Sequence, residues 1–256
     1  MDSISFQQIE TKEILQCVSD FIRTGRVLFN NFFGIGECGE YECHREAGTI
    51  LIRKKEFYFY RLFLISLDEG ELTNLLSVLN DEEYVINIPS KSSIENWDKL
   101  LRKCGYIFVD VYSRYYNNNI PCYPSSIDTF ASLDDLEVVQ DLLYNNFSFY
   151  TDHLPTKDEL KKMIENRQII TDLQDGQICG VMIYSIVGNK GYQNFWIDKG
   201  ENALALLFKA KNIFLEKGIK YCYYWVRDNN TPVIKIHKLL GGKPDGLKDY
   251  TYLKKK

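Results

Sequence analysis

The chain has 256 residues, of which 45% are hydrophobic and 14% aromatic, and its formal net charge is -4. This composition supplies enough apolar side chains for a folded core and excludes an intrinsically disordered chain. The acidic balance gives no overall basic footprint, so we expect no DNA partner. No apolar run reaches the roughly 18 residues of a membrane-spanning helix, so no membrane span is predicted.

The N-terminal segment MDSISFQQIE lacks a basic stretch followed by an apolar run, which disfavours a secretory signal. The seven cysteines are an odd number and are spread thinly along the chain, which favours reduced thiols and a cytoplasmic protein. Cys38, Cys43 and His44 are close in sequence, but no second ligand pair follows at zinc-finger spacing. We therefore predict no metal site.

In the first half, runs typical of strands alternate with helical patterns. The apolar run from Phe57 to Leu67 is interrupted by Arg61 and is typical of a buried strand. A helical pattern that begins at Ser93 ends before Gly105, a residue that favours helix termination. The elements expected in this half are strands at 57–67, 84–88 and 107–112, and helices at 71–79 and 93–103.

A segment rich in Asn, Pro and Ser, from Asn117 to Ser126, has the composition of a linker. It predicts two domains, at 1–122 and 123–256.

The second half has clear start and stop signals. Ser132–Asp135 is typical of a capping box, Asp175-Gly176 of a hairpin turn, and Gly218 of a helix end. The order β-α-α-β-β-β-α-β-α-β predicts a mixed sheet with early antiparallel hairpins and one parallel βαβ crossover. Lys254–Lys256 is expected to be a solvated end. The expected elements are strands at 127–131, 168–173, 177–187, 192–197, 221–227 and 250–253, and helices at 132–146, 156–166, 201–217 and 232–240.

The two halves share a pattern. Leu100–Tyr106 parallels Ile236–Gly242, and the matched glycines Gly105 and Gly241 are 136 residues apart (241 − 105). The element order is similar on both sides of this match, which favours an internal repeat. The predicted fold class is α/β (α+β), with two related domains that each hold a mixed, mostly antiparallel sheet flanked by helices.

The segment NTPVIKIHKLLGG, from Asn230 to Gly242, follows a strand and ends at two glycines. Its spacing matches the signature N-x-x-A-x-x-L-Y-x-K-L-G-F without a gap. His237 stands at the Tyr position of that signature, and Gly242 stands at the Phe position. The second half therefore resembles a GNAT (Gcn5-related) N-acyltransferase, the first half resembles a degenerate GNAT domain, and the whole chain resembles a tandem GNAT-like protein.

The resemblance implies transfer of an acyl group, such as acetyl, from acetyl-CoA or another acyl-CoA to an amine of a small molecule or peptide. In that family two neighbouring strands splay apart and the pantetheine arm of the donor lies between them. The diphosphate rests on backbone N–H groups at the start of the next helix, where the helix dipole favours an anion. No such diphosphate loop is found between Leu67 and Leu79, so the second half is expected to hold the thioester.

The family's diphosphate loop, Q/R-x-x-G-x-G/A, aligns with Asp198–Ala203, and only the final Ala fits. An Asp replaces the basic or amide residue, Glu201 replaces the first Gly, and Gly200 is displaced by one position. The alternative is a plain helix start. The donor-binding residues implied by the resemblance are Trp196, Ile197, Asp198, Lys199, Gly200, Asn202, Ala203, Leu204 and Asn230.

Two residues are candidates for the chemistry. His237 can protonate the departing thiolate if its imidazolium, with a reference pKa near 6.5, is populated at neutral pH. Asp228, which ends a strand, is a candidate base for the amine. His153 and Tyr224 are candidate acceptor contacts. The alternatives are a half-exposed helix position for His237, core packing for Tyr224 and a helix N-cap for Asn230.

Two other functions remain open. One is a catalytically inactive GNAT-like module that binds a ligand or a protein. The other is a tandem-GNAT transferase whose donor is a carrier-protein thioester or an aminoacyl-tRNA. The acidic balance disfavours tRNA.

Overall fold

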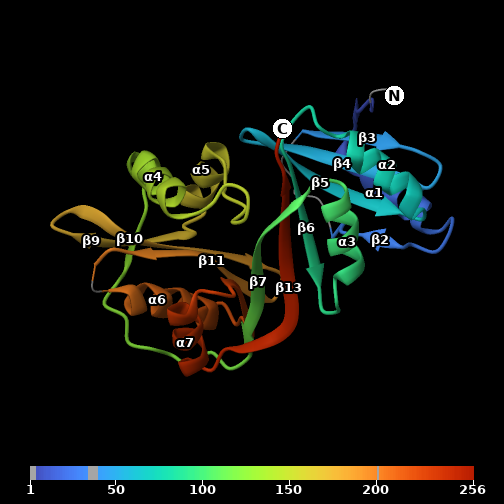
Figure 1. The fold of residues 1–256 in the computed structure, drawn as a ribbon. Coiled ribbons are helices and arrows are strands. Elements are labelled where there is room, and N and C mark those ends of the chain that lie inside the picture. Colours follow the sequence, from blue (N-terminus) through green and yellow to red (C-terminus); the bar gives the residue numbers. More distant parts are fainter. Residues whose placement is uncertain (1–3, 34–39, 201) are drawn as a thin grey trace. The chain divides into compact units, whose positions relative to one another are not determined.

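The computed structural model describes residues 4–33, 40–200 and 202–256 (Figure 1). The chain divides into two compact units, the first made of residues 1–111 and 248–256 and the second of residues 112–247. The sequence placed the domain boundary after residue 122. The compact units divide earlier, and the last residues of the chain return to the first unit. Within the described residues, no helix is both long and apolar enough to span a bilayer.

The first unit is a mixed sheet with the strand order β1-β3-β4-β5-β6-β13, and β2 also pairs with β5. β5 and β6 are parallel and are joined through α2, whereas the other pairs are antiparallel. Its elements are β1 (Gln7–Gln8), α1 (Thr11–Ile22), β2 (Phe29–Asn30), β3 (Tyr41–Arg45), β4 (Thr49–Glu56), β5 (Phe59–Ser66), α2 (Glu69–Val78), β6 (Tyr84–Ser90), α3 (Glu95–Lys103), the start of β7 (Ile107–Asn117) and the end of β13 (Lys243–Lys254).

Both faces of this sheet are covered. Leu51, Leu62 and Leu64 point to one face and pack with α2 and α3, whereas Ile50 and Ile52 point to the other face and pack with α1. Because alternate residues of β4 and β5 are buried on opposite faces, these strands are continuous apolar runs.

The second unit has the strand order β7-β12-β11-β10-β9-β8. α4 and α5 lie on one face of its sheet, and α6 and α7 lie on the other (Figure 1). The predicted element order is confirmed, including the parallel pair β11–β12 joined by α6. The elements are β8 (Thr129–Phe130), a 3-10 turn (Leu133–Asp135), α4 (Leu136–Asn146), α5 (Lys157–Glu165), β9 (Ile169–Gln174), β10 (Gln177–Val187), β11 (Lys190–Asp198), α6 (Ala203–Glu216), β12 (Tyr221–Arg227) and α7 (Thr231–Leu239).

The repeat seen in the sequence is present in the backbone. Gly105 and Gly241, which follow α3 and α7, have φ values of 86° and 83°. The next N–H after each glycine donates to the carbonyl five residues earlier, at 2.9 Å after Gly105 and at 2.8 Å after Gly241. Both helices therefore end in the same left-handed glycine motif.

The strand that follows α3 joins the sheet of the second unit, and the strand that follows α7 joins the sheet of the first unit. Residues 112–117 of β7, which follows α3, pair antiparallel with β12. Residues 248–254 of β13, which follows α7, pair antiparallel with β6. The expected solvated end is wrong for Lys254, which is a buried residue of β13 and donates to the carbonyl of Leu76 at 2.8 Å.

Candidate functional site

β11 and β12 are paired along only part of their length. Their parallel register runs from Lys190↔Tyr221 to Gln193↔Tyr224 and stops there, although β11 continues to Asp198. β10 stays paired with β11 to its end, and β7 stays paired with β12 to its end. The two strands therefore diverge after Gln193 and Tyr224, each held by its outer neighbour.

Buried polar groups gather at this divergence, on the face that α6 and α7 cover. Tyr224 is 3% exposed and stacks on His237 of α7, with ring centroids 3.8 Å apart. Trp196 of β11 meets the same imidazole edge-on at 6.1 Å. Among the described residues, the Tyr224 hydroxyl, His237 Nδ1, Trp196 Nε1 and the Gln193 amide have no hydrogen-bond partner. Buried polar atoms are rarely left without partners, so this cluster fits a position where a polar ligand binds.

Gly242, which follows α7, lies directly against the Tyr224 side chain of this cluster. A Cβ built on Gly242 would lie 1.8 Å from the hydroxyl oxygen of Tyr224 and 2.8 Å from the carbonyl oxygen of His237. The Tyr224 side chain therefore fills the space beside Gly242, and this packing explains why a glycine follows Gly241.

The start of α6 lies beside two carboxylates. Asp198 accepts from the N–H of Gly200 at 3.1 Å, and the side chain of Asn202 donates to both oxygens of Asp172 at 3.2 Å. The thiol of Cys179 donates to Asp172 at 3.2 Å. Burial and this hydrogen bond raise the pKa of Cys179 to about 11, so the thiol stays protonated.

Asp172, Cys179 and Asp198 lie within 4.8 Å of one another and form a group whose atoms suit a metal ion. In the structure Cys179 donates to Asp172, Asp172 also accepts from the side chain of Asn202, and Asp198 accepts from the backbone N–H of Gly200. The predicted candidate Cys38 lies outside the described residues, as does Glu201 of the loop.

The first unit has the same strand divergence, and a segment of its own chain fills it. β5 and β6 pair in parallel at only two positions, although both strands continue. Beyond that point β2 pairs antiparallel with the end of β5, on the edge that β6 has left. Leu28 N and Asn31 N donate to carbonyls of β5 on either side of this pairing, at 2.9 and 3.2 Å.

The side chain of Asn31 bridges the two diverging strands. Its amide donates to the carbonyl of Leu62 on β5 at 3.1 Å and to the carbonyl of Asn87 on β6 at 2.9 Å. Its oxygen accepts from the N–H of Leu64 at 2.7 Å. Asn31 is 1% exposed. The divergence in the first unit is therefore plugged by residues 28–31, and we call this segment the plug.

Comparison with solved structures identifies this architecture. An acetyltransferase of the GNAT family from Colwellia psychrerythraea matches 98% of this chain and 100% of its own, with a TM-score of 0.59 and 12% identity. A tandem GNAT protein from the clavulanic acid biosynthesis pathway matches 98% of both chains, with a TM-score of 0.59 and 10% identity. A GCN5-related N-acetyltransferase from Sphaerobacter thermophilus matches 87% of this chain and 82% of its own, with a TM-score of 0.61 and 14% identity.

The chain has a tandem GNAT fold. No family model matches its sequence, and no curated protein matches it either.

Within this GNAT fold, the residues expected to bind the donor follow the edge of the divergence. Trp196 faces α6 and α7, and Ile197 is buried. The side chain of Asn230 accepts from Val233 N at 3.4 Å, so the N-cap alternative for Asn230 is confirmed. The others form the loop and first turn that lead into α6: Asp198, Lys199, Gly200, Asn202, Ala203 and Leu204.

The two acceptor candidates lie apart. Tyr224 belongs to the core between the sheet, α6 and α7, which agrees with the core-packing alternative. His153 is exposed, in the loop between α4 and α5, and has a φ of 48°.

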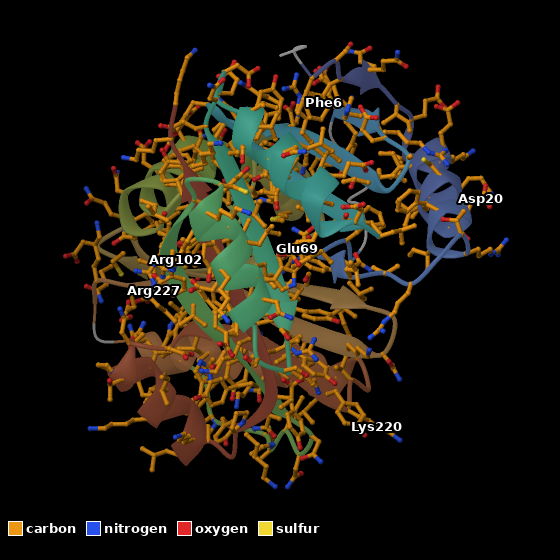
Figure 2. All side chains as sticks on the ribbon, turned by 45° about the vertical axis from the view of Figure 1, so that its right-hand side comes forward. Phe6, Asp20, Glu69, Arg102, Lys220 and Arg227 are labelled. Carbon is orange, nitrogen blue, oxygen red and sulfur yellow. The ribbon has the colours of Figure 1, made fainter. Side chains whose placement is uncertain are left out.

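Polar residues also gather where β12 ends. Asp228 accepts from the hydroxyl of Ser113 on β7 at 2.5 Å. Arg227, labelled in Figure 2, donates to the Tyr112 hydroxyl at 2.8 Å, and that hydroxyl donates to Asp152 at 2.5 Å. Arg227 and Tyr112 therefore tie the end of β12 and the middle of β7 to the loop that follows α4.

His237 differs from its expected state. It is 4% exposed rather than half-exposed, and burial, with a smaller effect of the Lys211 charge, lowers its pKa to about 3. The expected population of imidazolium at neutral pH is therefore wrong, because the imidazole is neutral there. A neutral imidazole still carries one N–H, so it can donate one hydrogen bond.

The burial of His237 predicts a loss of stability in acid. The unfolded chain protonates this histidine below pH about 6.5, whereas the folded chain keeps it neutral down to about 3, so stability falls as pH falls through this window. Between pH 7 and 5 the wild type should lose about 2 kcal/mol more than His237→Gln. Urea unfolding of both proteins at several pH values measures this difference, and parallel curves would contradict it.

Lys211 of α6 is 0% exposed and has no hydrogen-bond partner among the described residues. Its ammonium lies 5.6 Å from the ring centroid of Tyr123. Burial lowers the pKa of Lys211. A fully buried amine without a hydrogen bond is costly to folding.

Lys211→Met should therefore stabilise the protein by about 1–2 kcal/mol, since it removes a buried, unpaired amine and keeps the volume. Lys209→Met is the matched control on the same helix, because Lys209 is paired with Asp128. Thermal unfolding compares the two variants. A lower Tm for Lys211→Met than for Lys209→Met would show that the amine stabilises the fold.

Proposed function

We propose that the chain is an N-acyltransferase that moves an acyl group, such as acetyl, from an acyl-CoA-type thioester to an amine of a small molecule or peptide. The observation that carries this proposal is the open divergence of β11 and β12 in a GNAT fold. Beyond Gln193, no backbone hydrogen bond joins β11 to β12 among the described residues. This edge of β11 offers backbone groups to the amides of a pantetheine arm.

The plug supports a single donor site in each chain. In the first unit, Asn31 and β2 already use the backbone groups of β5 at the corresponding divergence. A pantetheine arm would have to displace several buried hydrogen bonds there, each worth about 1 kcal/mol. The first unit then serves to stabilise the protein.

In the proposed reaction the amine nitrogen attacks the thioester carbon directly, and the C–S bond breaks when the intermediate collapses. Backbone N–H groups of β11 stabilise the oxyanion. His237 can donate its N–H toward the departing sulfur, and Asp228 is the candidate base for the amine. Cys222 of β12 is not proposed as a nucleophile, because burial raises its pKa to about 12.

Calorimetric titration with an acetyl thioester, followed by mass spectrometry of a panel of amines, tests the proposal. We expect one donor bound per chain and transfer of the acetyl group to an amine. Binding of the donor without transfer to any amine would favour the inactive ligand-binding module. Binding of two donors per chain would show that the plug does not close the first unit.

A further inference from the structure

In a GNAT fold the diphosphate of CoA binds at the start of the helix that corresponds to α6, and here two backbone donors of the loop directly before α6 are engaged by the chain's own acceptors. The N–H of Gly200 donates to the carboxylate of Asp198 at 3.1 Å. The N–H of Lys199 donates to the carbonyl of Cys179 at 3.0 Å. Two donors of this loop are therefore engaged internally and are not offered to an anion.

Side chains of β9 also lie against this loop. A Cβ on Gly200 would lie 2.2 Å from the side-chain nitrogen of Gln174, at the end of β9. Asn202, directly before α6, turns its amide toward Asp172 rather than toward solvent. Residues of β9 and β10 thus supply the acceptors of Asn202 and Lys199.

The charge at this place has the wrong sign for a diphosphate. Asp172 is 4% exposed, and the neighbouring Asp198 is half-buried. Lys199 is exposed and offsets one of these charges, so the three described side chains leave one net negative charge. A carboxylate complements the positive end of a helix dipole, which leaves less attraction for a second anion. Coulomb repulsion then acts against a diphosphate at the same helix end.

The loop before α6 and the divergence of β11 and β12 differ in what they offer a donor, if the chain has the proposed function. At the divergence, the polar atoms of Gln193, Trp196, Tyr224 and His237 are unpartnered. Directly before α6, by contrast, the N–H groups of Lys199 and Gly200 and the side-chain amide of Asn202 are paired, and two carboxylates lie beside them. We propose that the site recognises its donor through the acyl-pantetheine arm and discriminates against the CoA diphosphate. The donor class is a pantetheine thioester, as presented by a phosphopantetheinyl carrier protein, whose arm bears a single phosphodiester charge in place of the two charges of the CoA diphosphate.

The test compares three donors on the full chain by calorimetry: S-acetyl-pantetheine, acetyl-CoA and an acetylated carrier protein. Each titration is run with EDTA and again with Mg²⁺, because a cation at Asp172 and Asp198 would reverse the local charge. We expect acetyl-pantetheine to bind at least as tightly as acetyl-CoA under both conditions, and the carrier to bind at least as tightly as acetyl-pantetheine.

A variant that removes one carboxylate charge distinguishes charge repulsion from steric exclusion of the diphosphate. Asp198→Asn keeps an oxygen that accepts from Gly200 N and removes one charge, so it should tighten acetyl-CoA about fivefold and leave acetyl-pantetheine unchanged. Asp141→Asn is the matched control, since Asp141 is exposed on α4, which lies on the opposite face of the sheet. It should change neither affinity.

Two results overturn the inference and leave the proposed function intact. One is acetyl-CoA binding at least tenfold tighter than acetyl-pantetheine, with or without Mg²⁺. The other is an Asp198→Asn variant whose ratio of the two affinities equals that of the wild type. Failure of all three donors to bind would instead refute the proposed function together with the inference.

Discussion

Deletion of residues 248–256 should leave the first unit unable to fold. These residues form the part of β13 that pairs with β6, from Lys248↔Ser90 to Lys254↔Tyr84. Tyr252 and Leu253 are buried in this pairing. Removal of two such side chains costs about 3–6 kcal/mol of apolar burial, a large share of the stability of an ordinary domain.

The deletion also breaks a buried polar network. Asn87 of β6 donates to both Asp249 and Thr251 at 3.0 Å, and Tyr252 donates to Asp98 on α3 at 2.7 Å. Without β13, Asn87 loses both acceptors, which adds about 1–3 kcal/mol.

Limited proteolysis and thermal unfolding measure the outcome of this deletion. We expect rapid cleavage within residues 40–111 and loss of the corresponding unfolding transition. The control removes only Lys255 and Lys256, which are exposed and follow β13. A deletion of 248–256 with the Tm of this control would show that β13 contributes little to the first unit.

Gly242→Ala should be strongly destabilising, although it adds one carbon. The new Cβ would meet the Tyr224 hydroxyl at 1.8 Å and the carbonyl oxygen of His237 at 2.8 Å. Tyr224 stacks between Tyr115 and His237, so the ring cannot swing away without breaking both contacts. Overpacking of this kind costs about 1–3 kcal/mol, and here the clash also moves the site.

A double-mutant cycle identifies the cause. Tyr224→Phe removes the hydroxyl oxygen and leaves the ring carbon, which lies 3.1 Å from the same Cβ. Gly242→Ala should therefore cost about 1 kcal/mol less in the Tyr224→Phe background than in the wild type. Urea unfolding of the four proteins gives the coupling energy. Additive effects would mean that the His237 carbonyl, rather than the hydroxyl, sets the need for glycine.

The second unit was predictable because its signals are local. Capping residues, hairpin turns and helix-ending glycines lie at nearly every boundary, and the observed strands 177–187 and 221–227 agree with the sequence at both ends. The first unit was harder. The turn between β4 and β5 contains Phe57 with a φ of 49°, a residue that gives no turn signal. The expected strand at 57–67 therefore began inside a hairpin, and α1 and β1–β4 were missed.

The candidate site shows a different limit of sequence reasoning. Lys211 occupies a position on the apolar face of α6, four residues after Leu207 and three before Phe214. A charged residue at an apolar position of the helical pattern could have been recognised from the sequence as unusual. Asp172, which follows the apolar start of β9, was another. The plug left no such signal, because Asn31 acquires its role only when β5 and β6 diverge around it. The burial that neutralises His237 likewise comes from packing, not from its neighbours in sequence.

The return of β13 to the first unit has a consequence for how the protein is made. The N-terminal half emerges first from the ribosome, yet the edge of β6 that β13 covers stays bare until residues 248–254 have been synthesised. Domains commonly fold in the order of synthesis, but here the earlier unit must wait for the later one. An exposed strand edge of this length invites pairing with other chains, so we expect nascent or C-terminally truncated chains to be prone to aggregation and to depend on chaperones.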